Sequence, residues 1–135
     1  RVISGDELVS FPCDIWIPAA RPDVLREDNV ERLDCRLVVQ GANVPTTREA
    51  ELRMFERGIV SVPDFIANAG GVVSAAVEYN GGVASTAFSA IEVNVGGNTR
   101  ATLERARDMG IPPVEAAMAL SVDRLRKMVS LRRWR

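Results

Sequence analysis

Three short apolar runs decide the fold, and each ends in small or polar residues: DIWIPAA (residues 14–20), RLVVQGAN (residues 36–43) and IVSVPDFIANAGG (residues 59–71). Their apolar parts begin 22 residues apart, with helical patterns between them. Such an alternation is typical of buried parallel strands connected by helices. In these sheets ligands bind beyond the carboxyl ends of the strands. The small residues at all three ends therefore predict a cleft in which a ligand can approach the backbone.

The composition indicates one domain with an aliphatic core. The chain has 135 residues, of which 47% are hydrophobic and 5% aromatic, and this length suffices for a sizeable core. Basic and acidic residues, 17 and 18 in number, are interspersed, so we expect no nucleic-acid partner. No apolar stretch approaches the length of about 18 residues that spans a membrane, and no leader pattern is found. We therefore expect no membrane partner and a cytoplasmic location.

Cysteine and histidine usage limits the chemistry. Cys13 and Cys35 lie beside apolar runs, where buried thiols are common, and the chain has neither a C-x-x-C motif nor any histidine. We expect two reduced thiols and no metal site. Without histidine, the commonest acid–base group near neutral pH is absent. Acid–base catalysis would need a carboxylate, Lys127, Tyr79 or residues outside this sequence.

Residues 13–62 predict the order strand–helix–strand–helix–strand, which implies two right-handed crossovers. We expect the first of these helices over residues 22–33, with its apolar side chains inward. A T-x-x-E capping box at residues 46–49 is expected to begin the second, and Gly58 lies where a helix C′ glycine belongs. The S-x-x-E spacing of residues 4–7 predicts a further short helix before the first strand.

The second half of the sequence is helical throughout. We expect one helix over residues 65–79 and then another that bends or breaks at glycines 96–97, because each costs about 1 kcal/mol in a helix interior. Gly110 is expected to end that helix, and prolines 112–113 to open the last one. The basic residues 132–135 are expected to form its solvated end. The predicted apolar face of the last helix comprises Val114, Ala117, Met118, Ser121, Leu125 and Met128.

A complete dinucleotide-binding domain opens with a strand, a G-x-G-x-x-G loop and a helix, and no such motif is present. Three parallel strands with their helices therefore resemble the half of a doubly wound α/β domain that lacks the pyrophosphate loop. We expect residues 1–80 to form this half. Residues 81–135 are expected to form a C-terminal helical segment that packs on it.

Three segments resemble motifs of the glutamate/leucine/phenylalanine/valine dehydrogenase family. CDIWIPAA (residues 13–20) is similar to its CDILIPAA, QGANVPTT (residues 40–47) to its EGANxPTT, and VPDFIANAGGV (residues 62–72) to its PDxLANAGGV. The likeness continues to residues 133–134 and so covers essentially the whole chain. The resemblance implies half of a Rossmann-like NAD- or NADP-binding domain. It also implies oxidative deamination of an L-amino acid to a 2-oxo acid and ammonia.

The family's catalytic lysines and aspartate belong to a separate substrate domain, so the resemblance implies no catalytic residue in this chain. The chain alone is expected to be an inactive fragment of an enzyme that is a homo-oligomer. The alternative is a stand-alone, non-catalytic nucleotide-binding or regulatory module. A G-x-G-x-x-G loop and a lysine-bearing substrate domain in the same gene would exclude that alternative.

The resemblance implies five cofactor-binding residues: Ala19, Ala20, Gly41, Asn43 and Asn68. The two alanines would let the ribose approach the first strand, or would instead pack tightly against a helix. Asn43 would bond near the nicotinamide ribose, or would form an Asx turn before Pro45. Asn68 would bond the nicotinamide carboxamide, for which an amide offers both a donor and an acceptor, or would cap a helix.

The resemblance places Gly70, Gly71 and Ala75 at the substrate. The glycines would let substrate or cofactor approach the backbone, or would allow close contact between helices. In glutamate-specific members, a serine at the position of Ala75 contacts the substrate carboxylate. Here the serine is one residue earlier, at Ser74, which is about 100° away around a helix. The resemblance therefore does not extend to specificity for glutamate.

Overall fold

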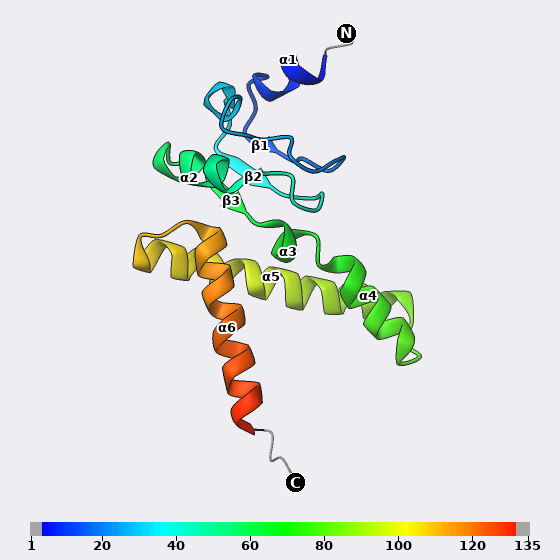
Figure 1. Ribbon diagram of the computed structural model, residues 1–135. Coiled ribbons are helices and arrows are strands. Elements are labelled where there is room, and N and C mark those ends of the chain that lie inside the picture. Colours follow the sequence, from blue (N-terminus) through cyan, green and yellow to red (C-terminus); the bar gives the residue numbers. More distant parts are fainter. Residues whose placement is uncertain (1–3, 132–135) are drawn as a thin grey trace.

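The structure is a computed structural model that describes residues 4–131 (Figure 1). Its elements are α1 (Gly5–Val9), β1 (Ile15–Trp16), the 3-10 helix η1 (Val30–Arg32), β2 (Leu37–Val39), α2 (Arg48–Glu56), β3 (Val60–Val62), α3 (Asp64–Ala67), α4 (Gly70–Tyr79), α5 (Ala84–Met109) and α6 (Pro113–Leu131). The predicted solvated end at residues 132–135 lies outside the described residues.

The three strands form one parallel sheet in the order β1-β2-β3. Ile15 lies opposite Leu37, and Leu37 lies opposite Val60. The α/β class and the parallel strands predicted from the sequence are confirmed. β1 is an edge strand, and the side chains of Ile15 and Ile17 are 53% and 60% exposed. In a complete doubly wound sheet this edge would pair with a further strand.

The main core lies between the sheet, α2 and the segment that precedes β2. Packing of these aliphatic side chains joins the two crossover segments to the sheet, and each buried side chain of this size contributes about 1.5–3 kcal/mol. The inward apolar side chains predicted for residues 22–33 are confirmed. The fully buried members of this core include Leu25, Val30, Leu33, Val38, Ala50 and Met54.

Residues 22–33 do not form the predicted helix; only η1 is helical there. Their backbone groups instead pair with the chain that enters α2. The Leu25 N–H donates to the Pro45 carbonyl at 2.9 Å, and its own carbonyl accepts from the Thr47 N–H at 3.0 Å. The guanidinium of Arg57 also donates to carbonyls of this segment. These hydrogen bonds to distant residues take the place of hydrogen bonds within a helix. The apolar side chains of the segment still point into the main core.

Helix α2 begins one residue later than predicted. Its N-cap is Thr47, whose hydroxyl accepts from the Ala50 N–H at 3.3 Å. Thr46 was the expected cap, but it is buried and forms a parallel bridge with Leu25. Gly58 follows the C-cap with φ +73°, as a C′ glycine does. The capping box that begins α1 is present as predicted.

The single helix expected over residues 65–79 is two helices, α3 and α4. The chain leaves helical geometry at Asn68, which has φ −97° and ψ 7°. Its side chain bonds to the loop that follows β2. A tertiary contact therefore overrides a sequence pattern that favours one continuous helix.

Helix α5 is continuous through Gly96 and Gly97, so the predicted break is wrong. The helix has 26 residues and packs along α4, α3 and α6. The packing of α5 against these helices stabilises it on both sides of the glycines. Helix formation is cooperative, so the two glycines between these packed parts stay helical despite their cost. Gly110, at φ +63°, ends α5 and Pro113 begins α6, both as predicted.

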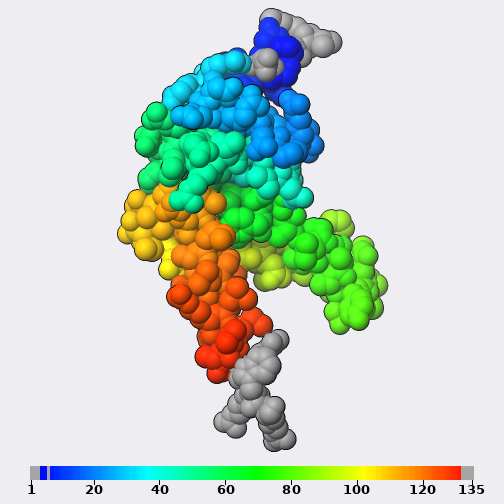
Figure 2. Space-filling view, in the orientation of Figure 1, coloured from blue at the N-terminus to red at the C-terminus, as the bar shows by residue number. Residues whose placement is uncertain are grey.

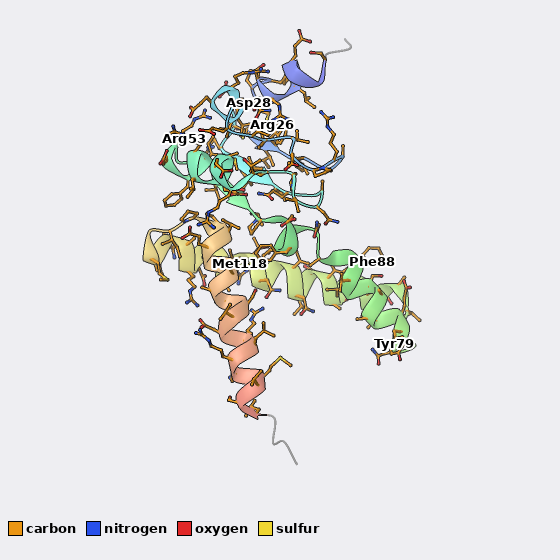
Figure 3. All side chains as sticks on the ribbon, viewed as in Figure 1. Arg26, Asp28, Arg53, Tyr79, Phe88 and Met118 are labelled. Atoms are coloured by element: carbon orange, nitrogen blue, oxygen red, sulfur yellow. The ribbon has the colours of Figure 1, made fainter. Side chains whose placement is uncertain are left out.

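The α4–α5 pair and α6 extend from the body of the molecule as two arms (Figure 2). Tyr79, Phe88 and Met118 are exposed on these helices (Figure 3). Of the apolar face predicted for α6, only Ala117 is buried, whereas Met118, Leu125 and Met128 are exposed. Asp123 and Arg124 of α6 still bond to Arg105 and Asn98 of α5.

Cys13 and Cys35 are free thiols, half-buried against the main core. Burial raises the pKa of the Cys35 thiol above its usual value. Across residues 4–131, we find no helix with the length and apolarity to cross a bilayer, and no cluster of three metal-binding side chains.

Candidate functional site

The carboxyl ends of the strands meet at one side of the sheet, as parallel strands require. The loops after β1 and β2 enclose a shallow pocket of about 310 Å³ there. Its lining combines small side chains with one amide and one guanidinium, so a ligand in it would lie close to the backbone. The lining residues are Ala19, Ala20, Arg21, Pro22, Gly41, Ala42 and Asn43.

Backbone hydrogen bonds join these two loops. The N–H groups of Gly41 and Ala42 both donate to the Pro18 carbonyl, at 3.0 and 2.8 Å. A Cβ added to Gly41 would lie 3.2 Å from the Cβ of Ala19, closer than side chains normally approach. Glycine at this position thus permits the close approach of the loops. The Cβ of Ala19 lies opposite Gly41 in the loop after β2, and both Ala19 and Ala20 are exposed.

The third loop joins the site through two asparagines. The Asn68 Nδ2 group donates to the Asn43 Oδ1 atom at 2.7 Å and lies 3.4 Å from the Ala42 carbonyl, which also accepts from it. Within residues 4–131, no other side chain or backbone group binds these amides, so the Asn68 Oδ1 and Asn43 Nδ2 atoms remain for a ligand. The Asn68 side chain does not cap α4, and the Asn43 oxygen serves Asn68 rather than an Asx turn.

Two residues that sequence reasoning missed hold the loop between β2 and α2. Val44 has φ +48°, although it is β-branched. Its N–H donates to the carboxylate of Asp64, the first residue of α3, at 2.7 Å. The pattern offered no signal for the left-handed Val44. An acidic residue directly after the third strand was visible, but it had no assigned partner.

A buried polar cluster, formed by Gln40, Glu51 and Ser61, lies behind the site. The Gln40 side-chain amide donates to Glu51 and to Ser61 Oγ, the latter at 3.0 Å. Burial raises the pKa of the Glu51 carboxyl above its ordinary value, and the hydrogen bonds from Gln40 and Ser61 partly oppose this. The cluster ties the end of β2 to both α2 and β3, directly before Gly41. Sequence reasoning did not identify it.

The predicted substrate residues lie on α4, apart from the pocket between the β1 and β2 loops. A Cβ on Gly70 would be in ordinary contact with Ile91 of α5, whereas one on Gly71 would meet open space. Gly71 and Ala75, four residues apart, share an exposed face of the helix. The Ser74 hydroxyl donates to the Glu78 carboxylate at 3.3 Å and so belongs to the helix surface.

Comparison with known proteins gives consistent matches. The profile of the Glutamate/Leucine/Phenylalanine/Valine dehydrogenase family matches residues 1–133. An NADP(+)-dependent glutamate dehydrogenase of Pyrobaculum calidifontis is 58% identical over 66 residues, which are 49% of this chain and 16% of that protein. A leucine dehydrogenase of Bacillus subtilis is 33% identical, over 95% of this chain and 35% of that protein.

The fold comparison agrees. The crystal structure of L-tryptophan dehydrogenase from Nostoc punctiforme superposes with a TM-score of 0.83 and 27% identity, over 90% of this chain and 37% of that one. The chain thus spans about a third of the length of relatives that match nearly all of it. The three sequence motifs, the parallel half-sheet and these matches show that the chain belongs to the glutamate/leucine/phenylalanine/valine dehydrogenase family.

Proposed function

We propose that these residues are part of an NAD- or NADP-dependent amino-acid dehydrogenase. In this proposal residues 1–80 are the second half of the cofactor-binding domain, and residues 81–135 are the helical segment that follows. The chain covers about a third of the relatives that match nearly all of it. The family resemblance implies that the catalytic lysines and aspartate belong to a separate substrate domain. We therefore assign this chain to binding and placement, with no catalytic residue of its own.

The observation that carries the proposal is the convergence of Gly41 and Asn43, which follow β2, with Asn68, which follows β3, at the carboxyl ends of the parallel strands. Doubly wound sheets bind their ligands at this position. The pocket beside Ala19 and Ala20 is lined by small side chains, which suits the close approach of a ribose. The free oxygen of Asn68 and the free amide hydrogens of Asn43 match the donors and acceptors of a carboxamide and a ribose hydroxyl. These residues fit the nicotinamide half of a dinucleotide.

Asn43 and Asn68 would hold the nicotinamide, which when bound would supply the hydride acceptor for oxidation of the amino acid at Cα; hydrolysis of the oxidised amino acid would give a 2-oxo acid and ammonia. The residues of this chain would bind the cofactor and fix the ring face that meets the substrate. Gly71 and Ala75 would line the approach from α4. Because Ala75 has no hydroxyl, it would contribute no hydrogen bond to a side-chain carboxylate of the substrate.

We further propose a cytoplasmic homo-oligomer. The free thiols Cys13 and Cys35 are compatible with a reducing compartment. The exposed β1 edge and the exposed apolar residues of α4, α5 and α6 favour burial against the rest of the protein or against other subunits. Size-exclusion chromatography with light scattering on the parent protein tests the oligomer.

The test of the proposed function is an assay of the full-length parent protein. NADH or NADPH formation would be followed at 340 nm, a wavelength set by the reduced nicotinamide, with glutamate, leucine, valine, phenylalanine and tryptophan as substrates in turn. We expect turnover of at least one of them. Absence of turnover with both cofactors would contradict the assignment.

A further inference from the structure

The loop that carries Asn43 turns sharply at Val44. The φ angle of +48° places Val44 in the left-handed region, where a β-branched side chain crowds the backbone. The side chain is 60% exposed, so packing does not hold it there. The conformation therefore depends on bonds to the main chain of Val44.

Two hydrogen bonds fix that main chain. The Val44 N–H donates to Asp64 Oδ2 at 2.7 Å, and the Val44 carbonyl accepts from the Asp23 N–H at 2.9 Å. The second oxygen of the Asp64 carboxylate accepts from the Phe65 N–H at 2.7 Å. One carboxylate thus joins the loop after β2 to the helix after β3. Bonds to an ionised acceptor are stronger than those between neutral groups.

Both neighbours of Asn43 in the loop are held by hydrogen bonds. Before it, Gly41 and Ala42 donate to the Pro18 carbonyl, and after it, Val44 donates to Asp64. Asn68, the C-cap of α3, reaches the same loop from about one helical turn after Asp64. Asp64 and Asn68 therefore hold the loop from a common short helix, one through the backbone of Val44 and the other through the side chain of Asn43.

We propose that Asp64 is a positioning residue of the cofactor site. Its carboxylate holds Val44 in the left-handed conformation and thereby keeps the Asn43 side chain against Asn68. Asp64 itself does not touch the cofactor. The effect on cofactor binding rests on the proposed function, whereas the effect on the conformation of the loop does not.

The test compares variants of the full-length parent protein. Asp64→Ala is expected to raise the KM for NAD or NADP about tenfold, the effect of losing a hydrogen bond to a charged group, with a smaller change in kcat. Glycine adopts positive φ without strain, so the double variant Asp64→Ala/Val44→Gly is expected to return within about threefold of the wild-type KM. Asp108→Ala is the control, because this exposed carboxylate on α5 contacts only the neighbouring Arg107 among the described residues.

Amide hydrogen exchange of residues 41–47 in the free protein gives a readout that is independent of activity. We expect faster exchange in Asp64→Ala and slower exchange again in the double variant. If Asp64→Ala does not fold, Asp64→Asn takes its place, because the asparagine amide keeps one acceptor oxygen. For this variant we expect about a threefold rise in the cofactor KM and again faster exchange of residues 41–47.

Two results would overturn the proposal. One is unchanged exchange at residues 41–47 together with an unchanged cofactor KM. The other is a raised KM that Val44→Gly does not lower, which would assign Asp64 to the stability of α3 alone. If the wild-type protein binds neither NAD nor NADP, the proposed function fails, and the exchange data still decide whether Asp64 holds the loop.

Discussion

Asn68 and Asn43, 25 residues apart in sequence, share a 2.7 Å hydrogen bond between their side-chain amides. The bond orients both groups, because Asn68 uses its Nδ2 donor on Asn43 and so presents its oxygen. It also ties the loop after β3 to the loop after β2 at the point where a ligand would lie. The following predictions test this arrangement and its supports.

Asn68→Ala in the parent protein is expected to lower kcat/KM by about twofold to tenfold, the effect of one lost hydrogen bond between neutral groups. The free energy of unfolding is expected to fall by less, since Asn68 caps α3 through its backbone N–H, which the variant keeps, and its side chain caps no helix. Steady-state kinetics and urea unfolding measure the two effects. Asn80→Ala is the matched control, because its amide donates to the Ala76 carbonyl at the far end of α4. A variant that unfolds readily but keeps wild-type kinetics when folded would make Asn68 a structural residue.

Glu51 predicts a pH dependence of stability. Burial raises its pKa in the folded protein above the ordinary value of 4.5, so the folded state binds its proton more tightly than the unfolded state does. This contribution to stability is complete below pH 4.5 and is lost as the pH rises through the folded pKa. Glu51→Gln is expected to flatten the pH profile of unfolding in that window. Equal profiles for Glu51→Gln and the unsubstituted protein would refute the prediction.

Gly41→Ala places a Cβ 3.2 Å from that of Ala19. The loops after β1 and β2 would have to separate, which is expected to cost about 1 kcal/mol of stability and to weaken cofactor binding. Denaturant unfolding and a cofactor titration measure these losses. Gly5→Ala, which meets open space in α1, is the control. Wild-type affinity in Gly41→Ala would show that the loops tolerate the extra methyl group.

Gly96→Ala is expected to stabilise the protein by about 0.5–1 kcal/mol, because α5 is helical through this position and alanine is the better helix former. Nothing lies within 4 Å of the added Cβ. Gly110→Ala is expected to destabilise instead, since Gly110 has φ +63°. Thermal unfolding of the two variants gives the comparison. Destabilisation by Gly96→Ala would indicate that α5 bends at this glycine after all.

The sequence predicted the elements whose patterns are local and repeated. The strands that begin near Ile15, Leu37 and Val60 follow from their apolar runs, and the helix ends at Gly58 and Gly110 follow from glycines at C′ positions. These features depend on neighbours in the chain, so short patterns suffice to find them.

The misjudged elements are those in which distant contacts override the local pattern. Residues 22–33 have an apolar helical spacing, but the backbone of residues 23–25 bonds to residues 44–47, and Arg57 binds two carbonyls near the end of the segment. Asn68 interrupts a helical pattern because its side chain bonds across to Asn43. Glycines 96–97 do not break α5 because the packing of its flanks outweighs their cost.

The sequence indicated candidate residues for the site, whose binding role stays a prediction, but not the contacts that support them. Motif resemblance indicated Asn43 and Asn68, whereas the bond between them needed the fold. Nothing in the sequence identifies the left-handed Val44 or its bond to Asp64. The burial of Glu51 was equally hidden, because a glutamate in the first turn of a helix is usually exposed.

The most direct test of the account is hydrogen exchange of the parent protein with and without saturating NAD or NADP. The account predicts slower exchange in residues 18–22, 41–47 and 66–71, which follow the three strands in the chain. It predicts no protection in residues 100–113, which lie near the amino end of β3. Binding that leaves these three segments unprotected would contradict the central claim that the cofactor lies across the carboxyl ends of β1, β2 and β3.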